Sequence, residues 1–233
     1  MPITLAELAF SSFVFSQFYD NRKYKELRNK TNDIPDLRNH DHRKELLIFL
    51  NGWGCRNIAK KYHPKTSEEL KKWYSQYRNA LPNKEKNLWD LTELELDSID
   101  CAFKDLANRI IATRRQNRRK VHFGFTAAAK TLFVLRPKAL VMWDNNIREK
   151  YVKNNGSYKD FLIKMKRLIS ELEKQCKHYG FSLNKLPKRL NREDTTVPKL
   201  IDEYNWITKT EPKGLKSDRI LTVDNFRQWS DWT

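Results

Sequence analysis

One acidic residue is distinguished by the apolar segment that precedes it. Asp144 directly follows KALVMW, residues 138–143, which is apolar after its first residue. A carboxylate bordered by Val141, Met142 and Trp143 is partly desolvated, and desolvation moves its pKa or strengthens its electrostatic effect on a nearby reacting group. Asp is also a favoured N-cap, and the residues after Asp144 predict a helix. A catalytic carboxylate and a structural cap therefore both remain open at this position.

A single lysine interrupts an apolar helix shortly before Asp144. Residues 126–135, TAAAKTLFVL, predict a helix that is apolar on nearly every side, and Lys130 is its one charged residue. Such a lysine either reaches a functional cleft, where it orients Asp144 or a bound ligand, or extends its alkyl chain so that the ammonium group stays at the surface. We include Lys130 among the candidate catalytic residues.

A dense basic run and a glycine turn precede this helix. The run RRQNRRK is followed by HFGF, in which Gly124 can adopt a positive φ. A helix, a short hairpin and a second helix can hold a phosphate, because the backbone N–H groups and the dipole of the second helix both face the anion. An ordinary helical hairpin with a solvated charged face explains the same residues equally well. The candidate phosphate contacts are Arg114, Arg115, Arg118, Arg119, Lys120, His122, Phe123, Gly124 and Thr126.

The composition favours a polyanionic partner. The chain has 233 residues, and 46 Lys and Arg against 29 Asp and Glu give a formal net charge of +17. An excess of this size, spread along the chain, points to nucleic acid, although many exposed lysines on an ordinary protein would give the same count. The aromatic residues suffice for a packed core, so the composition argues against a disordered chain.

The cysteines and the N-terminal segment indicate the compartment. Cys55, Cys101 and Cys176 are widely spaced and form no CxxC pair, which fits a reducing compartment and neither a disulfide framework nor a zinc site. We expect no metal and no cofactor. The apolar segment near the N-terminus is too short to span a bilayer and lacks a basic leader, so we expect a cytoplasmic, nucleoid-associated monomer.

The elements that must position these residues are helices. Apolar residues recur with helical periodicity over 42–50, 66–80, 97–112, 126–135, 145–154, 159–178 and 198–206. Thr66 and Glu69 have the spacing of a capping box, and Gly180 is placed to end the helix that begins at 159. The polar stretches 31–42, 184–197 and 208–224 predict loops. The sequence therefore predicts an all-α fold.

Residues 118–148 resemble the core of the helix-hairpin-helix DNA glycosylases, the superfamily of endonuclease III and of the alkyladenine and 8-oxoguanine glycosylases. HFGFTAAAKTLFVL resembles the hairpin and its second helix, with Gly124 at the turn, and VMWDNNIR resembles the segment that bears the family's catalytic Asp. The family hairpin has two glycines, whereas this segment has one. The resemblance implies two helical lobes around a DNA-binding cleft, with 41–136 as the hairpin-bearing lobe and 1–40 plus 137–233 as the second.

The resemblance also implies an activity. Asp144 would take the role of the catalytic Asp, and Thr126 stands where bifunctional members carry a nucleophilic lysine, which implies a monofunctional enzyme that uses water. The expected function is excision of a flipped damaged or modified base from double-stranded DNA, in repair or in defence against phage. Trp53 and Trp143 are the candidate walls of the base pocket.

Two alternatives remain open. The first is a non-catalytic DNA-binding protein that uses the same hairpin, with Asp144 as a cap alone. The second is a metal-dependent nuclease, because IPDLRNHDHRKE offers Asp36, Asp41, Lys44 and Glu45. That chemistry needs an acid-x-Lys element on strands, and this segment is polar, loop-like and wrongly spaced for it.

Overall fold

The computed structural model describes residues 3–19, 21–114, 117–153 and 156–210, and these residues fall into two compact units. We call Asn21–Asp144 the hairpin unit, and Met1–Asp20 with Asn145–Thr233 the terminal unit. The boundaries lie at residues 20 and 144, whereas the resemblance implied residues 40 and 136. Arg115 and residues 211–233 lie outside the described residues, together with part of the predicted loop 208–224.

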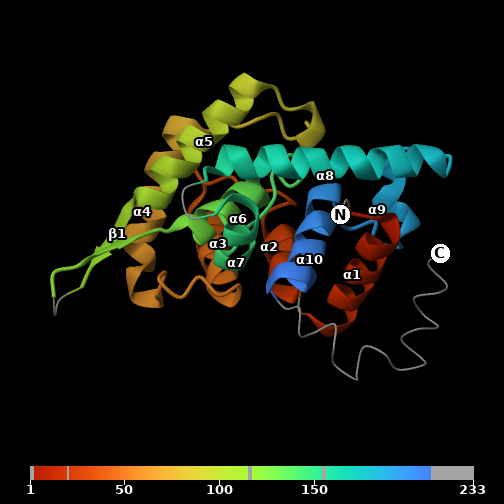
Figure 1. The fold of residues 1–233 in the computed structure, drawn as a ribbon. Helices are drawn as coiled ribbons and strands as arrows, with labels where there is room; N and C mark the ends of the chain where they lie inside the picture. The colour runs from red at the N-terminus through yellow and green to blue at the C-terminus, as the bar shows by residue number, and fades with distance from the viewer. Residues whose placement is uncertain (1–2, 20, 115–116, 154–155, 211–233) are drawn as a thin grey trace. The chain divides into compact units, whose positions relative to one another are not determined.

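The terminal unit is built from helices (Figure 1). They are α1 (Leu5–Phe18), α7 (Asn145–Val152), α8 (Tyr158–His178), α9 (Leu186–Arg189) and α10 (Val197–Asn205), with the short turns η3 (Leu183–Lys185) and η4 (Trp206–Thr210). The predicted helices at 159–178 and 198–206 are confirmed as α8 and α10. Helix α8 begins with a capping box between Ser157 and Asp160 and ends before Gly180, whose φ is +76°.

The hairpin unit contains the remaining elements. They are α2 (Arg22–Lys30), α3 (His40–Gly52), η1 (Lys60–Tyr62), α4 (His63–Tyr77), η2 (Leu88–Asp90), α5 (Glu93–Asn108), β1 (Ile110–Thr113), β2 (Lys120–His122) and α6 (Phe125–Leu135). The predicted capping box at Thr66 and Glu69 is wrong. Helix α4 has a proline in its first turn and begins at His63, so Thr66 lies inside the helix, where its hydroxyl donates to the Tyr62 carbonyl.

The helix predicted over 97–112 ends early and is followed by a strand. Helix α5 stops at Asn108, and β1 and β2 form an antiparallel two-stranded sheet between α5 and α6. The β-branched residues Ile110, Ile111 and Val121 favour the extended conformation here. The structure is mostly helical, as predicted, but a β-hairpin replaces the expected tight turn between the two helices.

Aromatic packing explains why α2 belongs to the hairpin unit. The Tyr24 ring on α2 lies 6.1 Å from Phe49 and 5.9 Å from Trp53, both at the end of α3, and 5.5 Å from Phe133 on α6. These contacts bury apolar surface of three helices in one cluster. A boundary at residue 40 would separate α2 from the residues that it covers.

The segment after α6 also belongs to the hairpin unit. The backbone N–H groups of Ala139 and Leu140 donate to the Arg136 carbonyl, and the Leu88 N–H donates to the carbonyl of Lys138. Residues 139–143 are all buried. The side chain of Arg136 is also buried and donates to the Pro82 carbonyl, which holds the loop after α4 against the end of α6. Among the helices that the structure describes, none combines the length and the apolar character needed to cross a bilayer.

Candidate nucleic-acid interface

A two-stranded β-ribbon stands out from the helices of the hairpin unit. Cα partners across it are Ile110 with His122, Ala112 with Val121, and Thr113 with Lys120, and the register shifts between Ile110 and Ala112. Beyond Thr113, the Arg114 N–H donates to the Arg119 carbonyl at 2.9 Å. We call residues 110–122 the basic ribbon, and Figure 1 shows it extending away from α4 and α5.

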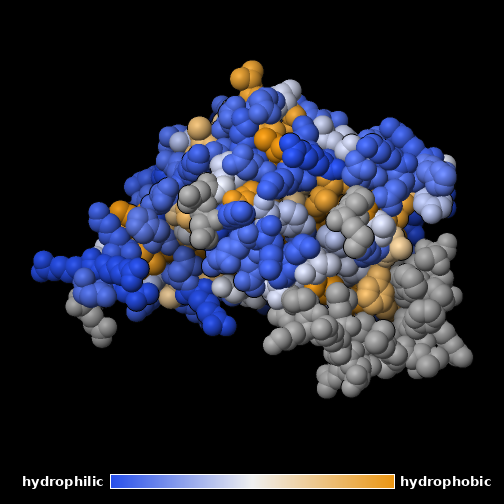
Figure 2. Space-filling model, viewed as in Figure 1, coloured by the Kyte–Doolittle hydropathy of each residue, from blue (hydrophilic) through white to orange (hydrophobic). Residues whose placement is uncertain are grey.

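The root of the basic ribbon is fixed to the end of α5. The Phe123 N–H donates to the Arg109 carbonyl and the Gly124 N–H to the Ala107 carbonyl, each at 2.9 Å. Ile111 and Val121 are buried at this root, whereas Thr113, Lys120 and His122 are exposed. The projecting part of the ribbon is coloured as hydrophilic in Figure 2. The ribbon therefore has an anchored apolar root and a polar outer part.

The described cations of the basic ribbon are not paired with carboxylates. Residues 106–143 contain nine Lys and Arg and no Asp or Glu. Within the described residues, no ion pair involves Arg114, Arg118, Arg119 or Lys120. The four predicted cations that are described therefore share one projecting element.

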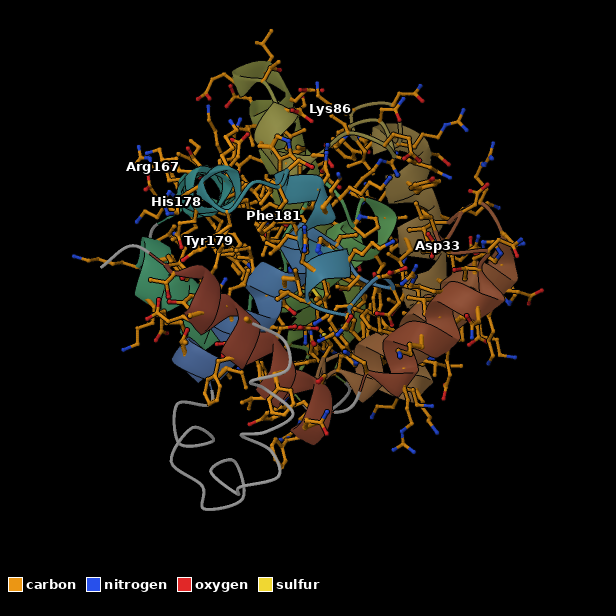
Figure 3. All side chains as sticks on the ribbon, turned by 90° about the vertical axis from the view of Figure 1, so that its right-hand side faces the viewer. Asp33, Lys86, Arg167, His178, Tyr179 and Phe181 are labelled. Atoms are coloured by element: carbon orange, nitrogen blue, oxygen red, sulfur yellow. The ribbon has the colours of Figure 1, made fainter. Side chains whose placement is uncertain are left out.

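Several cations elsewhere in the hairpin unit are paired with carboxylates. Lys86 lies 2.7 Å from Glu95, and Asp33 lies 2.5 Å from Arg28 (Lys86 and Asp33 are labelled in Figure 3). A hollow of about 590 Å³ at the root of the ribbon is lined by both signs of charge: Lys65, Glu69, Lys104, Asp105, Asn108, Arg109 and Ile110. The basic ribbon differs from these positions, because its four described cations are close in sequence and have no carboxylate beside them.

Gly124 has the positive φ that the sequence predicts, but its N–H group has another use. Its φ is +90°, and it is the N-cap of α6. Its N–H donates within the protein, as does the N–H of Phe123, so neither is directed at a phosphate as expected. Asn57 holds the turn from the other side, because its amide donates to the carbonyls of His122 and Phe123. The side chain of Phe123 is 1% exposed, which makes it a core residue rather than a contact residue.

The exposed aromatic residue at this turn is Phe125, which sequence reasoning missed. Phe125 is the first residue of α6, and it is 43% exposed although it is a large apolar side chain. Its ring stacks on Phe103 of α5 at 5.8 Å. Gly124 offers no side chain to cap the first turn of α6. The two phenylalanines of HFGF flank a glycine of positive φ, and this conformation buries the first ring and exposes the second.

Trp143, the residue before Asp144, contacts the first turn of α6. The Trp143 indole N–H donates to the Phe125 carbonyl at 3.4 Å, and the Trp143 ring meets Phe103 edge-on at 5.4 Å. Asp144 is the next residue and is half-buried, and α7 begins directly after it. The contacts of Trp143 with Phe103 and Phe125 therefore hold the chain directly before Asp144 against the start of α6.

Trp143 and Trp53 do not line one exposed pocket as predicted. Trp143 is 2% exposed, because Phe103 and Phe125 cover its ring. Trp53 is half-buried in the aromatic cluster at the end of α3, 4.7 Å from the Phe49 ring. Both indoles pack within the hairpin unit.

Lys130 is bound to the end of α3. Its ammonium group donates to the Trp53 carbonyl and lies 5.6 Å from the centre of the Trp53 ring. A cation near the last carbonyls of a helix interacts favourably with the helix dipole and so stabilises the helix. Burial raises the pKa of the nearby Cys55 thiol, an effect that the charge of Lys130 partly offsets. The geometry supports a structural role for Lys130. Thr126 lies in the first turn of α6, one turn before Lys130.

The residues of the nuclease alternative do not converge. The Arg38 guanidinium beside Asp36 lowers the pKa of that carboxyl, Asp41 lies in the first turn of α3, and Glu45 pairs with Lys30 at 3.0 Å. The structure, as far as it describes the chain, holds no group of three or more His, Cys, Asp or Glu side chains that could bind a metal ion.

The site thus consists of the basic ribbon, the first turn of α6 with Phe125, and Asp144, all within the hairpin unit. No family model matches the chain, and no curated protein or solved structure matches it either.

Proposed function

We propose that this protein is a monofunctional DNA glycosylase that binds double-stranded DNA through its hairpin unit. One observation carries the proposal: the basic ribbon leads into the start of α6, where Phe125 is exposed, and Trp143, the residue before the half-buried Asp144, bonds to the Phe125 carbonyl. The ribbon supplies phosphate contacts, which give affinity with little sequence preference. The resemblance to the helix-hairpin-helix glycosylases supplies the reaction.

The proposed chemistry assigns a separate role to each part of the site. An enzyme that acts on a base must take it out of the stack, and the ring of Phe125 offers an apolar face to the flipped base or to the stack that it leaves. Glycosidic cleavage passes through an oxocarbenium-like state, which the Asp144 carboxylate stabilises while it activates water. Thr126 offers no amine for a Schiff base, so the product is an abasic site and the strand remains intact.

The function is tested by incubating the protein with duplexes that carry damaged or phage-modified bases, in the presence of a chelator. The expected result is alkali-labile abasic sites on at least one duplex, with no strand break before alkali. A strand break that appears only when magnesium replaces the chelator would instead support the nuclease alternative. Binding without abasic sites on any duplex of the panel would contradict the glycosylase proposal.

A non-catalytic DNA-binding protein is the second candidate. The position of Asp144 directly before α7 favours it, because Asp is common at helix starts for structural reasons alone. This candidate keeps the basic ribbon and the ring of Phe125 as contacts. It differs from the first candidate only in the absence of abasic product.

Gly124→Ala is expected to destabilise the protein and to weaken DNA binding. Gly124 has φ +90° and ψ 154°, a region that costs a residue with a side chain about 1–3 kcal/mol. An added Cβ would also lie 3.1 Å from the Asn57 amide nitrogen, which must then shift by a few tenths of an ångström from the carbonyls of His122 and Phe123 that it holds. Denaturant unfolding and duplex affinity measure the two effects.

Gly180→Ala is the matched control for Gly124→Ala. Gly180 also has a positive φ, but its added Cβ would meet nothing within 4 Å, and it lies in the terminal unit. This variant should lose stability and keep its affinity for DNA. Equal affinities of the two folded variants would remove the Gly124 turn from the interface.

Phe125→Ala is expected to reduce duplex affinity by roughly 5- to 150-fold, because one stacked base contributes about 1–3 kcal/mol to binding. Phe125→Leu should lose most of this affinity as well, although it keeps apolar volume against Phe103 and protects the fold. Leu94→Ala is the control, since Leu94 is an exposed apolar residue of the same unit, 79% exposed. Fluorescence anisotropy measures the affinities, and unchanged affinity in both Phe125 variants would contradict the stacking role.

A further inference from the structure

We infer that the basic ribbon enters the major groove of duplex DNA as an arm. The inference rests on the proposed DNA binding and says how the ribbon takes part in it. A cationic surface alone would predict contacts along the outside of the phosphate backbone. The geometry of the ribbon points to insertion instead.

The dimensions of the ribbon suit this groove. The major groove is about 12 Å wide and about 8.5 Å deep, and it admits a two-stranded ribbon. From the buried Ile111 to Arg114 at the last described rung there are three residue steps, which at about 3.3 Å each span about 10 Å. The described part of the ribbon is therefore long enough to bring its arginines to the base edges while its root stays outside the groove.

The distribution of side chains also favours insertion. The apolar residues Ile111 and Val121 lie at the root, so the projecting part shows no apolar surface that needs a protein partner. Thr113 and Lys120 face each other across the ribbon, and both are exposed. Hydroxyl and ammonium groups at this level can contact phosphates on the two sides of a groove or the edges of bases.

The tip places arginines where a groove binder needs them. Arg114 and Arg119 are joined by a backbone hydrogen bond at the last described rung of the ribbon, and Arg118 follows the turn. Arg118 has φ +51°, a conformation in which Gly or Asn would be less strained. Arginine recognises the O6 and N7 atoms of guanine with two parallel hydrogen bonds, and these atoms lie in the major groove. A-form RNA has a deep, narrow major groove that side chains cannot read, so the ribbon fits DNA rather than duplex RNA.

The root of the ribbon keeps the arm stiff. Backbone hydrogen bonds tie Phe123 and Gly124 to the end of α5, and the register shift near Ile111 strengthens the local twist. A preorganised arm loses less conformational entropy on binding than a flexible basic loop. The ribbon and the exposed ring of Phe125 then act from adjoining positions, the ribbon on the groove and Phe125 on the base stack.

The test uses the full-length protein and a set of duplexes of random sequence. Methylation of guanine N7 in the major groove should interfere with binding of the wild-type protein, and a ligand that fills the minor groove should not compete with it. A ribbon-shortened variant, in which an Asn-Gly turn replaces residues 114–119 and keeps Thr113 opposite Lys120, should lose the interference. Circular dichroism and denaturant unfolding report whether this variant folds.

Point variants test the same inference where the shortened ribbon fails to fold. Arg118→Gly relieves the positive φ as it removes the charge, so it cannot act by straining the turn. Combined with Arg119→Gln and Lys120→Gln, it should reduce the slope of log K against log salt by about 0.9 for each phosphate that the variant no longer neutralises. The triple variant Lys65→Gln, Lys72→Gln and Lys104→Gln is the control of equal charge change, because these three lysines are paired on the same unit, and it should leave the slope nearly unchanged.

The outcomes separate the arm from the proposed function. Duplex binding by the wild-type protein without N7 interference would overturn the major-groove arm and leave the glycosylase proposal in place. Tighter binding to duplex RNA than to DNA would overturn the arm as well. If the wild-type protein forms abasic sites and the ribbon variants bind DNA with wild-type affinity, the arm is rejected and the glycosylase proposal stands. No duplex binding by the wild-type protein at any salt concentration would reject both.

Discussion

Asp144→Asn is expected to reduce abasic-site formation by about 100-fold or more, the usual loss when one preorganised electrostatic contact to a transition state is removed. The amide has no charge to stabilise an oxocarbenium ion and no basicity to activate water. Asn is about as good an N-cap as Asp, so stability should stay within about 1 kcal/mol of the wild type. Affinity for DNA should stay equal or rise slightly, because one carboxylate no longer repels the phosphates.

The control for Asp144→Asn is Glu149→Gln, which removes the same charge five residues later. Glu149 is exposed on α7 and should change neither activity nor stability. Single-turnover rates on the cleaved duplex measure the effect without interference from product release. Full activity of Asp144→Asn would reduce Asp144 to a structural residue and leave the non-catalytic DNA-binding protein as the better explanation. Borohydride should trap little covalent adduct in either protein, since Thr126 has no amine.

The helices were predictable because their apolar residues repeat with a helical period. Helix α8 follows the stripe from Phe161 to Cys176, which the structure buries at both ends. Thr66 and Glu69 have the spacing of a capping box, but they do not form one in the structure. A proline in the preceding turn starts α4 earlier, and Glu69 pairs instead with Lys65 and Lys72. Local spacing predicts that a helix exists better than it predicts where the helix begins.

The basic ribbon was not predictable by the same method. Its strands have four and three residues, too few for an alternating pattern to appear, and Ile110 continues the helical stripe of α5 by chance of spacing. The hydrogen bonds that fix the ribbon join Phe123 and Gly124 to the end of α5, across many residues of chain. They depend on the conformation of the turn, which the sequence indicates only through Gly124.

The candidate site was predictable in part, because a run of apolar residues indicates a buried segment but not the exposure of a single side chain. Asp144 was found because the apolar residues before it mark a buried segment, and the structure buries residues 139–143. Composition could not tell which aromatic side chain stays exposed. The turn at Gly124 buries Phe123 and exposes Phe125, and Trp143 is covered by residues from two helices. Exposure is decided by tertiary packing, which sequence spacing does not report.

A cluster of buried charges in the terminal unit was likewise hidden from sequence reasoning, and we expect it to dominate the stability of that unit. Glu203 on α10 is 0% exposed and accepts hydrogen bonds from Arg192 at 2.7 and 3.0 Å and from Ser12 at 2.8 Å. Lys199 is also buried, 3.5 Å from Glu203 and 4.3 Å from the centre of the Phe15 ring. The cluster thus links α1, the segment after α9 and α10.

Glu203→Ala is expected to lower the free energy of unfolding by about 3–5 kcal/mol, because it leaves the nearly buried charge of Arg192 without its carboxylate partner, whereas Lys199 keeps Asp202 at 2.9 Å. Such a loss is a large share of the roughly 5–15 kcal/mol that holds a typical domain together. Glu171→Ala is the control: Glu171 pairs with Lys174 at a partly exposed position of α8 and should cost about 1 kcal/mol or less. Denaturant unfolding of both variants measures the difference. Removing the partner as well, in Glu203→Ala with Arg192→Met, should restore part of the stability, because the double change leaves fewer buried charges unpaired. Equal small losses in Glu203→Ala and Glu171→Ala would mean that water reaches the cluster and that these charges do not hold α1 against α10.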